Sequence, residues 1–295
     1  MSTPVNDPFP FWKMHGAGND FVVVETDALD VADASWGALA ERVCDRHRGV
    51  GADGLILVQP SRVADRKMRI FNADGSDGVM CVNGIRCFAK FCIDRGLAAA
   101  PDGRMTVETG PGVIPVQGFR GEDGTIARVQ VTTAVPNLDP AASGVAIQQP
   151  GPVQNLPVTV ADEQGESTQH VAIVSMGNPH AVQFIPGAPA DYPLLRIGPL
   201  MEHHAVFTQR TNFEVVRVVD RAHVEMRVWE RGVGETLACG SGACAVVVAA
   251  RLRGEVDDHV AVRLPGGTLE IEWNGHDAVS LTGPAVRVFE SEWTH

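Results

Sequence analysis

Apolar positions recur along the chain in two periods, which together predict strands and helices in one molecule. Short β-branched runs between Gly, Pro and Asn predict strands. Runs with apolar residues three and four positions apart predict helices. The predicted helices are 35–44, with Ser35 as a candidate cap, 84–95 and 241–254. The predicted strands and strand pairs are 11–14, 21–25, 55–60, 105–110, 113–119, 127–133, 170–185, 211–230, 260–275 and 279–289.

The order of these runs favours an α+β fold. Residues 105–133 read as three strands separated by Gly and Pro, which is typical of an antiparallel meander. Residues 1–10 contain three prolines and are expected to form a loose lead-in. Residues 134–155 lack periodicity and are expected to contain the crossover between two halves.

Two stretches of the chain are similar in sequence and form an internal repeat. MRIFNADGSDGVMCVNGIRC begins at Met68, and MRVWERGVGETLACGSGAC begins at Met226. In each copy an apolar run enters a glycine-rich turn, and a cysteine then precedes a helical run. Cys81 and Cys239 lie 158 positions apart, and a second pair, Asn19 and Asn178, lies 159 positions apart.

Such a period is far too long for a solenoid and indicates two like domains. We expect two pseudo-symmetric domains, each a curved, mostly antiparallel sheet or barrel around a central helix. The predicted boundaries are 1–133 for the first domain, with 282–295 returning to it, and 134–281 for the second. Small-molecule sites commonly lie between such domains.

The paired cysteines suggest proton transfer. A cysteine at a helix N-terminus meets N–H groups that lack helical partners and the positive end of the dipole, so the thiolate is expected to be favoured. Two thiols on opposite faces of one carbon could remove and return its proton, as a racemase or epimerase requires. No lysine lies in a cofactor-like motif, so nothing in the sequence indicates a pyridoxal Schiff base.

Three other interpretations were weighed. A single cysteine is usually a packing residue, and we assign Cys44, Cys87, Cys92 and Cys244 to that role because they lie within helical runs. Cysteine spacings of six and five do not match a zinc ribbon, so no metal is expected. A Cys–His hydrolase could use His180, but it would leave the second cysteine unexplained.

Composition narrows the possible partners. The formal net charge is −12 and the pI is near 5.2, which argues against nucleic acid or an anionic membrane. No apolar run reaches the ~18 residues of a membrane span. The first residues do not form a secretory signal, and six cysteines are too few for a disulfide scaffold. A cytoplasmic protein with a small-molecule substrate is therefore expected.

Seven sequence motifs together resemble those of one known protein family. KMHGAGNDF, FNADGSxxxxCxNGxRC, VSMGNPH, RTNFE, ERGxGET, ACGSGAC and LPGGxLxIxW occur in this order from about residue 11 to 288. Together they resemble diaminopimelate epimerase. The resemblance implies a cofactor-independent enzyme that interconverts LL- and meso-diaminopimelate in lysine and peptidoglycan-precursor biosynthesis. It also implies a homodimer.

The resemblance also implies roles for individual residues. Cys81 and Cys239 match the two acid/base thiols, and His180 matches a histidine near the site. The matched substrate-binding positions are Asn19, Asn72, Val82, Asn83, Asn178, Asn212, Glu230, Arg231, Gly240 and Ser241. Asparagine suits a substrate with two zwitterionic ends because its amide both donates and accepts.

Two positions depart from the family pattern. Gly54 stands where glutamine is often found, and Val82 stands where glycine usually follows the first cysteine. Two alternative functions remain open at this stage. One is a proline- or hydroxyproline-type racemase with the same chemistry, and the other is a phenazine-type isomerase relative or a binding module.

Overall fold

The computed structural model describes residues 8–27, 29, 35–147 and 151–294. The chain divides into two compact units, Met1–Thr132 with Thr282–His295, and Thr133–Leu281. Residues 1–7 of the expected lead-in lie outside the described residues. The first strand begins at Phe9, so the lead-in is shorter than expected.

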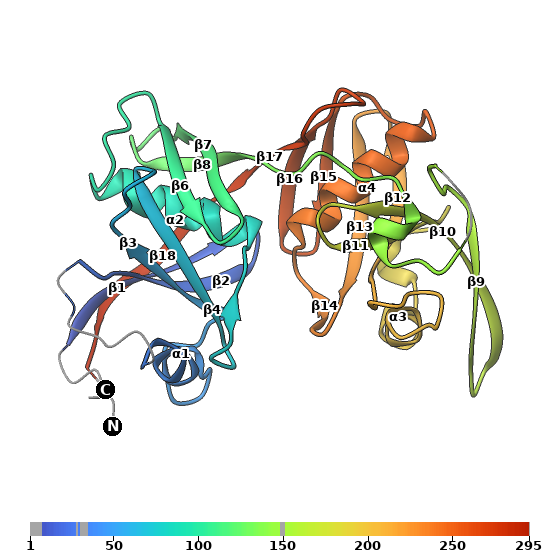
Figure 1. Cartoon of the computed structure of the whole chain (residues 1–295), viewed down its shortest axis with the longest axis horizontal. Helices are drawn as coiled ribbons and strands as arrows, with labels where there is room; N and C mark the ends of the chain where they lie inside the picture. Colours follow the sequence, from blue (N-terminus) through green and yellow to red (C-terminus); the bar gives the residue numbers. More distant parts are fainter. Residues whose placement is uncertain (1–7, 28, 30–34, 148–150, 295) are drawn as a thin grey trace. The chain divides into compact units, whose positions relative to one another are not determined.

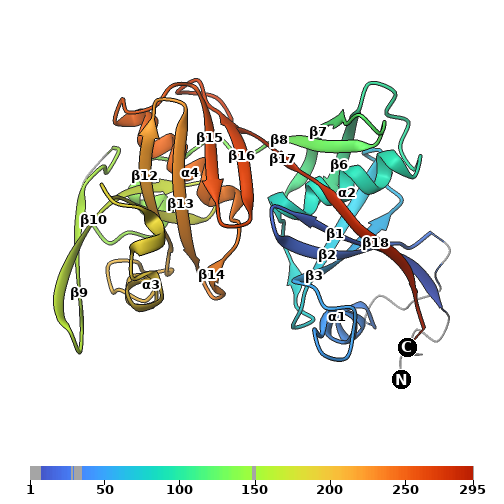
Figure 2. The ribbon, with the colours of Figure 1, turned by 180° about the vertical axis from the view of Figure 1, so that it is seen from behind.

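The first unit is built around a curved sheet. The chain order is β1 (Phe9–Gly16), β2 (Asn19–Glu25), α1 (Trp36–Cys44), β3 (Gly54–Gln59), β4 (Arg66–Asn72), β5 (Asp77–Gly78), α2 (Val82–Asp94), β6 (Arg104–Thr109), β7 (Gly112–Arg120) and β8 (Ile126–Thr132). Strand β18 (Val286–Trp293) pairs with β1 and so brings the chain end into this unit (Figure 2). The predicted meander β6–β7–β8 is confirmed.

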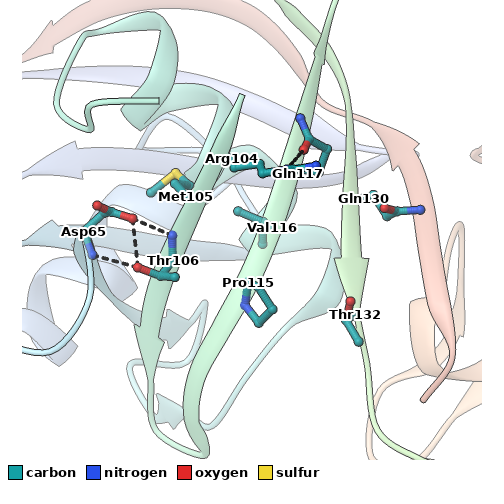
Figure 3. Close-up of a pocket in the computed structure, with 9 residues that line it drawn as sticks. All are labelled: Asp65, Arg104, Met105, Thr106, Pro115, Val116, Gln117, Gln130 and Thr132. Carbon is teal, nitrogen blue, oxygen red and sulfur yellow. Dashed lines mark hydrogen bonds between the residues drawn. The ribbon is translucent and has the colours of Figure 1, made fainter. Parts of the chain in front are cut away.

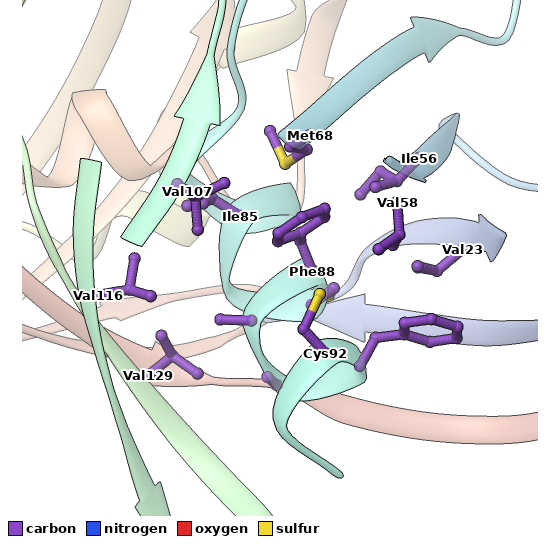
Figure 4. Packing of buried hydrophobic residues seen from close by; sticks show 14 of the residues in the cluster. Val23, Ile56, Val58, Met68, Ile85, Phe88, Cys92, Val107, Val116 and Val129 are labelled. Atoms are coloured by element: carbon purple, nitrogen blue, oxygen red, sulfur yellow. The ribbon is translucent and has the colours of Figure 1, made fainter. Parts of the chain in front are cut away.

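The two helices of this unit cover opposite faces of the sheet (Figure 1). Alternate strand residues point to opposite faces. Val23 and Ile56 pack on Phe88 of α2, whereas Val22 and Leu55 belong to the cluster around α1. Figure 4 shows Phe88 among strand side chains, with Cys92 one turn further along α2. Burial on both faces explains why these strands read as continuous apolar runs.

The second unit repeats this order. Its elements are η2 (Pro140–Ser143), β9 (Leu156–Asp162), β10 (Gly165–Ser175), β11 (Pro179–Phe184), η3 (Pro189–Asp191), α3 (Leu194–Glu202), β12 (Asn212–Asp220), β13 (His223–Glu230), β14 (Gly234–Thr236), α4 (Gly240–Leu252), β15 (His259–Leu264) and β16 (Gly267–Glu272). Strand β17 (Ser280–Pro284) contains the boundary between the two units at Leu281. Helix α4 is buried along almost its whole length and contacts β10, β11, β12 and β16.

The register of the strands relates the two units residue by residue. Strands β2 and β3 are parallel with Phe21 opposite Gly54, and β11 and β12 are parallel with His180 opposite Asn212. In each unit one helix crosses between these parallel strands, and a second helix crosses between the next parallel pair, β4–β6 or β13–β15. The α+β class with two like halves is therefore confirmed, and most pairings are antiparallel.

Several details differ from the predicted elements, and strands β9 and β14 were not predicted. Helix α3 was not predicted, because Gly198 and Pro199 interrupt its apolar pattern. The expected strand 279–289 is two strands that part at Ala285. The Ser35 side chain makes no capping hydrogen bond to α1. Helices α2 and α4 are confirmed, and Gly96 and Gly254 follow them with positive φ.

Gly54 gives a direct test of the packing between strands. A methyl group added there would lie 2.7 Å from the Phe71 carbonyl oxygen, so this backbone leaves no room for glutamine. Gly54→Ala is expected to lower the free energy of unfolding by about 1–3 kcal/mol in urea denaturation. At the matched control Gly187 no described atom lies within 4 Å of such a methyl group, and Gly187→Ala should change stability by less than about 0.5 kcal/mol. Equal effects of the two substitutions would contradict this explanation.

Candidate active site

Cys81 is the N-cap residue of α2. Its backbone is extended (φ −135°), and its sulfur accepts a hydrogen bond from Gly84 N at 3.4 Å. The thiol in turn donates to Asn19 Oδ1 at 3.5 Å. The predicted place of this cysteine at the start of a helix is confirmed, and its side chain is partly exposed.

The Asn19 amide is held in one orientation. Its Nδ2 donates to Asp53 Oδ2 at 2.7 Å, so Oδ1 faces the cysteine. Asn83 Nδ2 also donates to Oδ1, at 3.2 Å. Because Oδ1 can only accept, the Cys81 thiol is the donor in its contact with Asn19. Asp53 therefore helps to define the site, although no motif in the sequence marks it.

The other two positions expected in this unit lie at the end of β4 and at the start of α2. Asn72 ends β4, is exposed, and donates from Nδ2 to Ser76 Oγ at 2.9 Å. Val82 is the first residue of α2, and its carbonyl accepts from Arg86 Nη1 at 3.1 Å. The Val82 side chain is partly buried against the α2 core, so it packs within the unit.

Cys239 is the N-cap residue of α4 and repeats the geometry of Cys81. Its sulfur accepts from Gly242 N at 3.4 Å and lies 3.6 Å from Ser241 Oγ. Gly240 is buried in the first turn of the helix, and Cys239 itself is 5% exposed. The second predicted helix-capping cysteine is thus confirmed, in a more buried setting than the first.

The expectation that the helix terminus favours thiolate is wrong for Cys239. Burial, followed by the charges of Glu230 and Glu214, raises the pKa of its thiol well above the ordinary value. Hydrogen bonds from Ser241 and Gly242 lower this pKa, but by less than burial and the two carboxylates raise it. Desolvation of a charged group therefore outweighs the helix dipole here, and Cys239 is a thiol at neutral pH.

Glu230 is the carboxylate that accepts a hydrogen bond from the Cys239 thiol. Burial raises the pKa of Glu230, while hydrogen bonds from Thr236 and Cys239 lower it. Thr236 Oγ1 donates to Glu230 Oε1 across the hairpin of β13 and β14. A carboxylate that accepts from a thiol can take its proton. Thr236 was not singled out from the sequence.

His180 and Glu214 form a fully buried pair behind the second cysteine. His180 Nδ1 lies 2.6 Å from Glu214 Oε1, and Nε2 lies 3.0 Å from Asn178 Oδ1. Asn178 Nδ2 donates to Ser241 Oγ at 3.3 Å. His180, Asn178 and Ser241 are therefore brought together, as expected, and Glu214 joins them without having been predicted.

Asn212 connects two backbone segments. Its Nδ2 donates to Pro179 O at 2.8 Å, and its Oδ1 accepts from Arg231 N at 2.9 Å. The side chain is 4% exposed. Arg231 is exposed and donates from Nη1 to Gln209 O at 3.0 Å. Asn212 thus fixes the Glu230–Arg231 turn relative to the start of β11.

The remaining cysteines lie in the cores. Cys44, Cys87, Cys92 and Cys244 are buried, which confirms their predicted packing role. Burial raises the pKa of Cys44 and of Cys87 to about 12, and it raises that of Cys92 as well. These thiols stay protonated at neutral pH.

A hollow of about 460 Å³ lies on the outer surface of β6, β7 and β8 (Figure 3). Asp65 accepts from Thr106 there, and Arg104 Nε donates to Gln117 Oε1 at 3.0 Å. The hollow contains none of the predicted site residues. The side chains suited to acid–base chemistry therefore lie at the N-termini of α2 and α4 and not in this hollow.

Comparison with known proteins decides the family. The sequence model of diaminopimelate epimerase matches residues 11–135 and 172–288. The diaminopimelate epimerase of Acetivibrio thermocellus is 45% identical over 292 residues, covering 96% of this chain and 97% of that protein. That of Desulforudis audaxviator is 48% identical over 285 residues, covering 96% and 98%. The chain belongs to the diaminopimelate epimerase family.

Solved structures place this family member among proteins of the same fold. A hydroxyproline epimerase from Agrobacterium vitis has a TM-score of 0.69 at 14% identity, covering 99% of this chain and 93% of its own. A phenazine biosynthesis protein from Bacillus anthracis has a TM-score of 0.68 at 18% identity, covering 97% and 99%. At such identities the likeness concerns the fold alone.

Proposed function

We propose that the protein interconverts LL- and meso-diaminopimelate by moving a proton at one α-carbon, without a cofactor. The repeated helix-capping cysteine, in a chain of the diaminopimelate epimerase family, carries this proposal. Each half supplies one thiol in the same local geometry. Epimerisation needs two acid/base groups, one for each face of the carbon.

The proton steps follow from the groups around each thiol. Glu230 accepts the proton of Cys239, and the resulting thiolate removes the α-proton of the substrate. The Cys81 thiol then gives its proton to the opposite face of the carbanion and becomes a thiolate. Asn19 Oδ1 supports this assignment because it holds Cys81 as a proton donor at rest.

The carbanion must be stabilised while it exists. We assign this to N–H groups of the first helical turns, which include those of Gly240 and Ser241 in α4. Helix N-termini bind carboxylates, and fixed donors in a dry site stabilise charge as it develops. Asn72 and Asn178 supply amides for the polar ends of the substrate, and Arg231 adds an exposed guanidinium. Asn212 acts indirectly, by holding the turn that contains Arg231.

The function is tested by incubating purified protein with LL-diaminopimelate and separating the stereoisomers by chiral chromatography. We expect meso-diaminopimelate to form without added pyridoxal phosphate. Proline and hydroxyproline are the matched alternative substrates. Turnover of either, with none of diaminopimelate, would establish the racemase alternative, and inactivity on all three would favour a binding module.

The same proposal includes a cytoplasmic homodimer. No helix in the described part of the chain is long and apolar enough to span a membrane. Strand β18 exposes the apolar side chains of Val286, Val288 and Phe289, which a second copy could cover. Light scattering should give twice the 31.5 kDa chain mass, and Val288→Asp should shift the protein toward monomer.

A further inference from the structure

A chain of polar side chains runs behind Cys239. Glu214 Oε1 lies 2.6 Å from His180 Nδ1, and His180 Nε2 lies 3.0 Å from Asn178 Oδ1. Asn178 Nδ2 donates to Ser241 Oγ at 3.3 Å, and Ser241 Oγ lies 3.6 Å from Cys239 Sγ. Four contacts therefore connect a fully buried carboxyl group with the sulfur.

The donors and acceptors along this series of side chains can be assigned from their chemistry. Asn178 Oδ1 can only accept, so His180 Nε2 carries a proton and donates it. On the other side of the ring, His180 Nδ1 faces Glu214 Oε1, which fixes the orientation of the imidazole. Because the Cys239 thiol donates its own hydrogen to Glu230, the sulfur is the acceptor in its contact with Ser241, and the Ser241 hydroxyl is the donor. The chain thus ends in a donor directed at the thiol.

The fold does not need this buried pair. By register, the counterparts of His180 and Glu214 in the first unit are Phe21 and Ile56, and both are buried and apolar. Among the described residues Glu214 Oε2 has no hydrogen-bond partner. Replacing a buried ion pair by apolar residues is often neutral or stabilising. A functional reason is therefore needed for its presence in one unit only.

We propose that Glu214 is a positioning residue that orients His180 and, through Asn178, makes Ser241 a hydrogen-bond donor to Cys239. This inference rests on the proposed acid/base role of Cys239. The ionisable groups that face Cys239 are Glu230 from β13, Glu214 from β12 and, beyond Glu214, His180 from β11. A methyl group added at Gly242 would lie 2.8 Å from Glu214 Oε1, which places the carboxyl beside the first turn of α4.

Alkylation of the full-length protein by iodoacetamide tests the proposal without any substrate. The rates at Cys81 and Cys239 are followed by mass spectrometry of their peptides across a pH series, because thiolate is the reactive form. Glu214→Ile copies Ile56 and leaves His180 Nδ1 without its anchor. We expect alkylation of Cys239 at neutral pH to slow about fivefold, the size of one lost hydrogen bond, while Cys81 is unchanged.

Glu214→Gln is the conservative variant that should rescue the effect. Its amide can donate to His180 Nδ1, which keeps the proton on Nε2, so Cys239 should react within about twofold of wild type. If both variants speed the reaction, Glu214 acts only as a nearby negative charge, and the proposal is wrong. It is equally wrong if Glu214→Ile has no effect or if the two variants slow the reaction alike.

Two further measurements separate this role from general disruption. Cys244 is fully buried in the same helix, so its alkylation reports unfolding and should stay negligible. If Glu214→Ile does not fold, the double variant His180→Phe with Glu214→Ile copies the complete apolar pair and should give the same slowing. Because the readout needs no diaminopimelate, an inactive protein with the expected alkylation pattern would refute the proposed function alone.

Discussion

Replacing either Cys81 or Cys239 with alanine is expected to lower kcat about a thousandfold or more, while the protein stays folded. General acid–base groups typically contribute on the order of 10²–10⁴ in rate, and each thiol serves a step that no described neighbour could perform on the same face. KM should change little, because a group that acts only in proton transfer adds little to ground-state binding. Steady-state kinetics on LL-diaminopimelate measures both quantities.

The matched control for this prediction is Cys244→Ala. Cys244 lies in the same helix as Cys239, five positions further on, and is fully buried. Its substitution should leave kcat within about twofold and lower the free energy of unfolding by about 1 kcal/mol, as small cavities do. A cysteine variant at position 81 or 239 that kept a tenth of the wild-type kcat would refute the two-thiol mechanism.

Glu230→Gln is expected to lower kcat about a hundredfold with KM within about threefold. The Cys239 thiol has a raised pKa, so it needs a base before it can act as one, and Glu230 accepts its hydrogen bond. An amide cannot take that proton. Burial raises the pKa of Glu230, and only its ionised form accepts a proton. The wild-type kcat should therefore fall as pH drops through that raised pKa, and the variant should lack this acid limb.

Glu235→Gln is the control for the loss of a carboxylate from the same hairpin. Glu235 accepts from Arg227 at 2.7 Å in the β13–β14 pair and has no contact with either catalytic thiol among the described hydrogen bonds. We expect kcat within about threefold of wild type. If both glutamine variants lost activity equally, the hairpin would have a structural role and Glu230 would not be the base.

The sequence predicts most of the fold because the duplicated pattern is strong. Helix α4 is apolar on nearly all sides, and α2 is apolar except along one polar stripe. Each helix begins after a cysteine and ends before a glycine with positive φ. The sequence does not predict helix α3, because Gly198 and Pro199 interrupt its apolar pattern. Gly198 is nevertheless required there, since a methyl group at this position would lie 2.6 Å from the Trp229 ring.

The candidate site could be predicted only in part, because burial decides its chemistry. The position of Cys239 at a helix N-terminus follows from sequence, but its raised pKa depends on desolvation and on two carboxylates that the fold brings to it from β12 and β13. Glu214 did carry a signal, as an acid inside the apolar run FEVV at the position that Ile56 holds in the first half. Asp53 carried no comparable signal, because its contact with Asn19 joins the bend before β3 to the first residue of β2.

The most direct test of the account is the placement of deuterium during early turnover of LL-diaminopimelate in D₂O. With two bases, the thiol that returns the proton has equilibrated with solvent, while the other thiol takes the proton of the substrate. Mass spectrometry should then find one deuterium at the inverted α-carbon of meso-diaminopimelate and almost none in the recovered LL-isomer. Equal labelling of substrate and product would indicate a single base and would contradict the assignment of Cys81 and Cys239 as partners in one reaction.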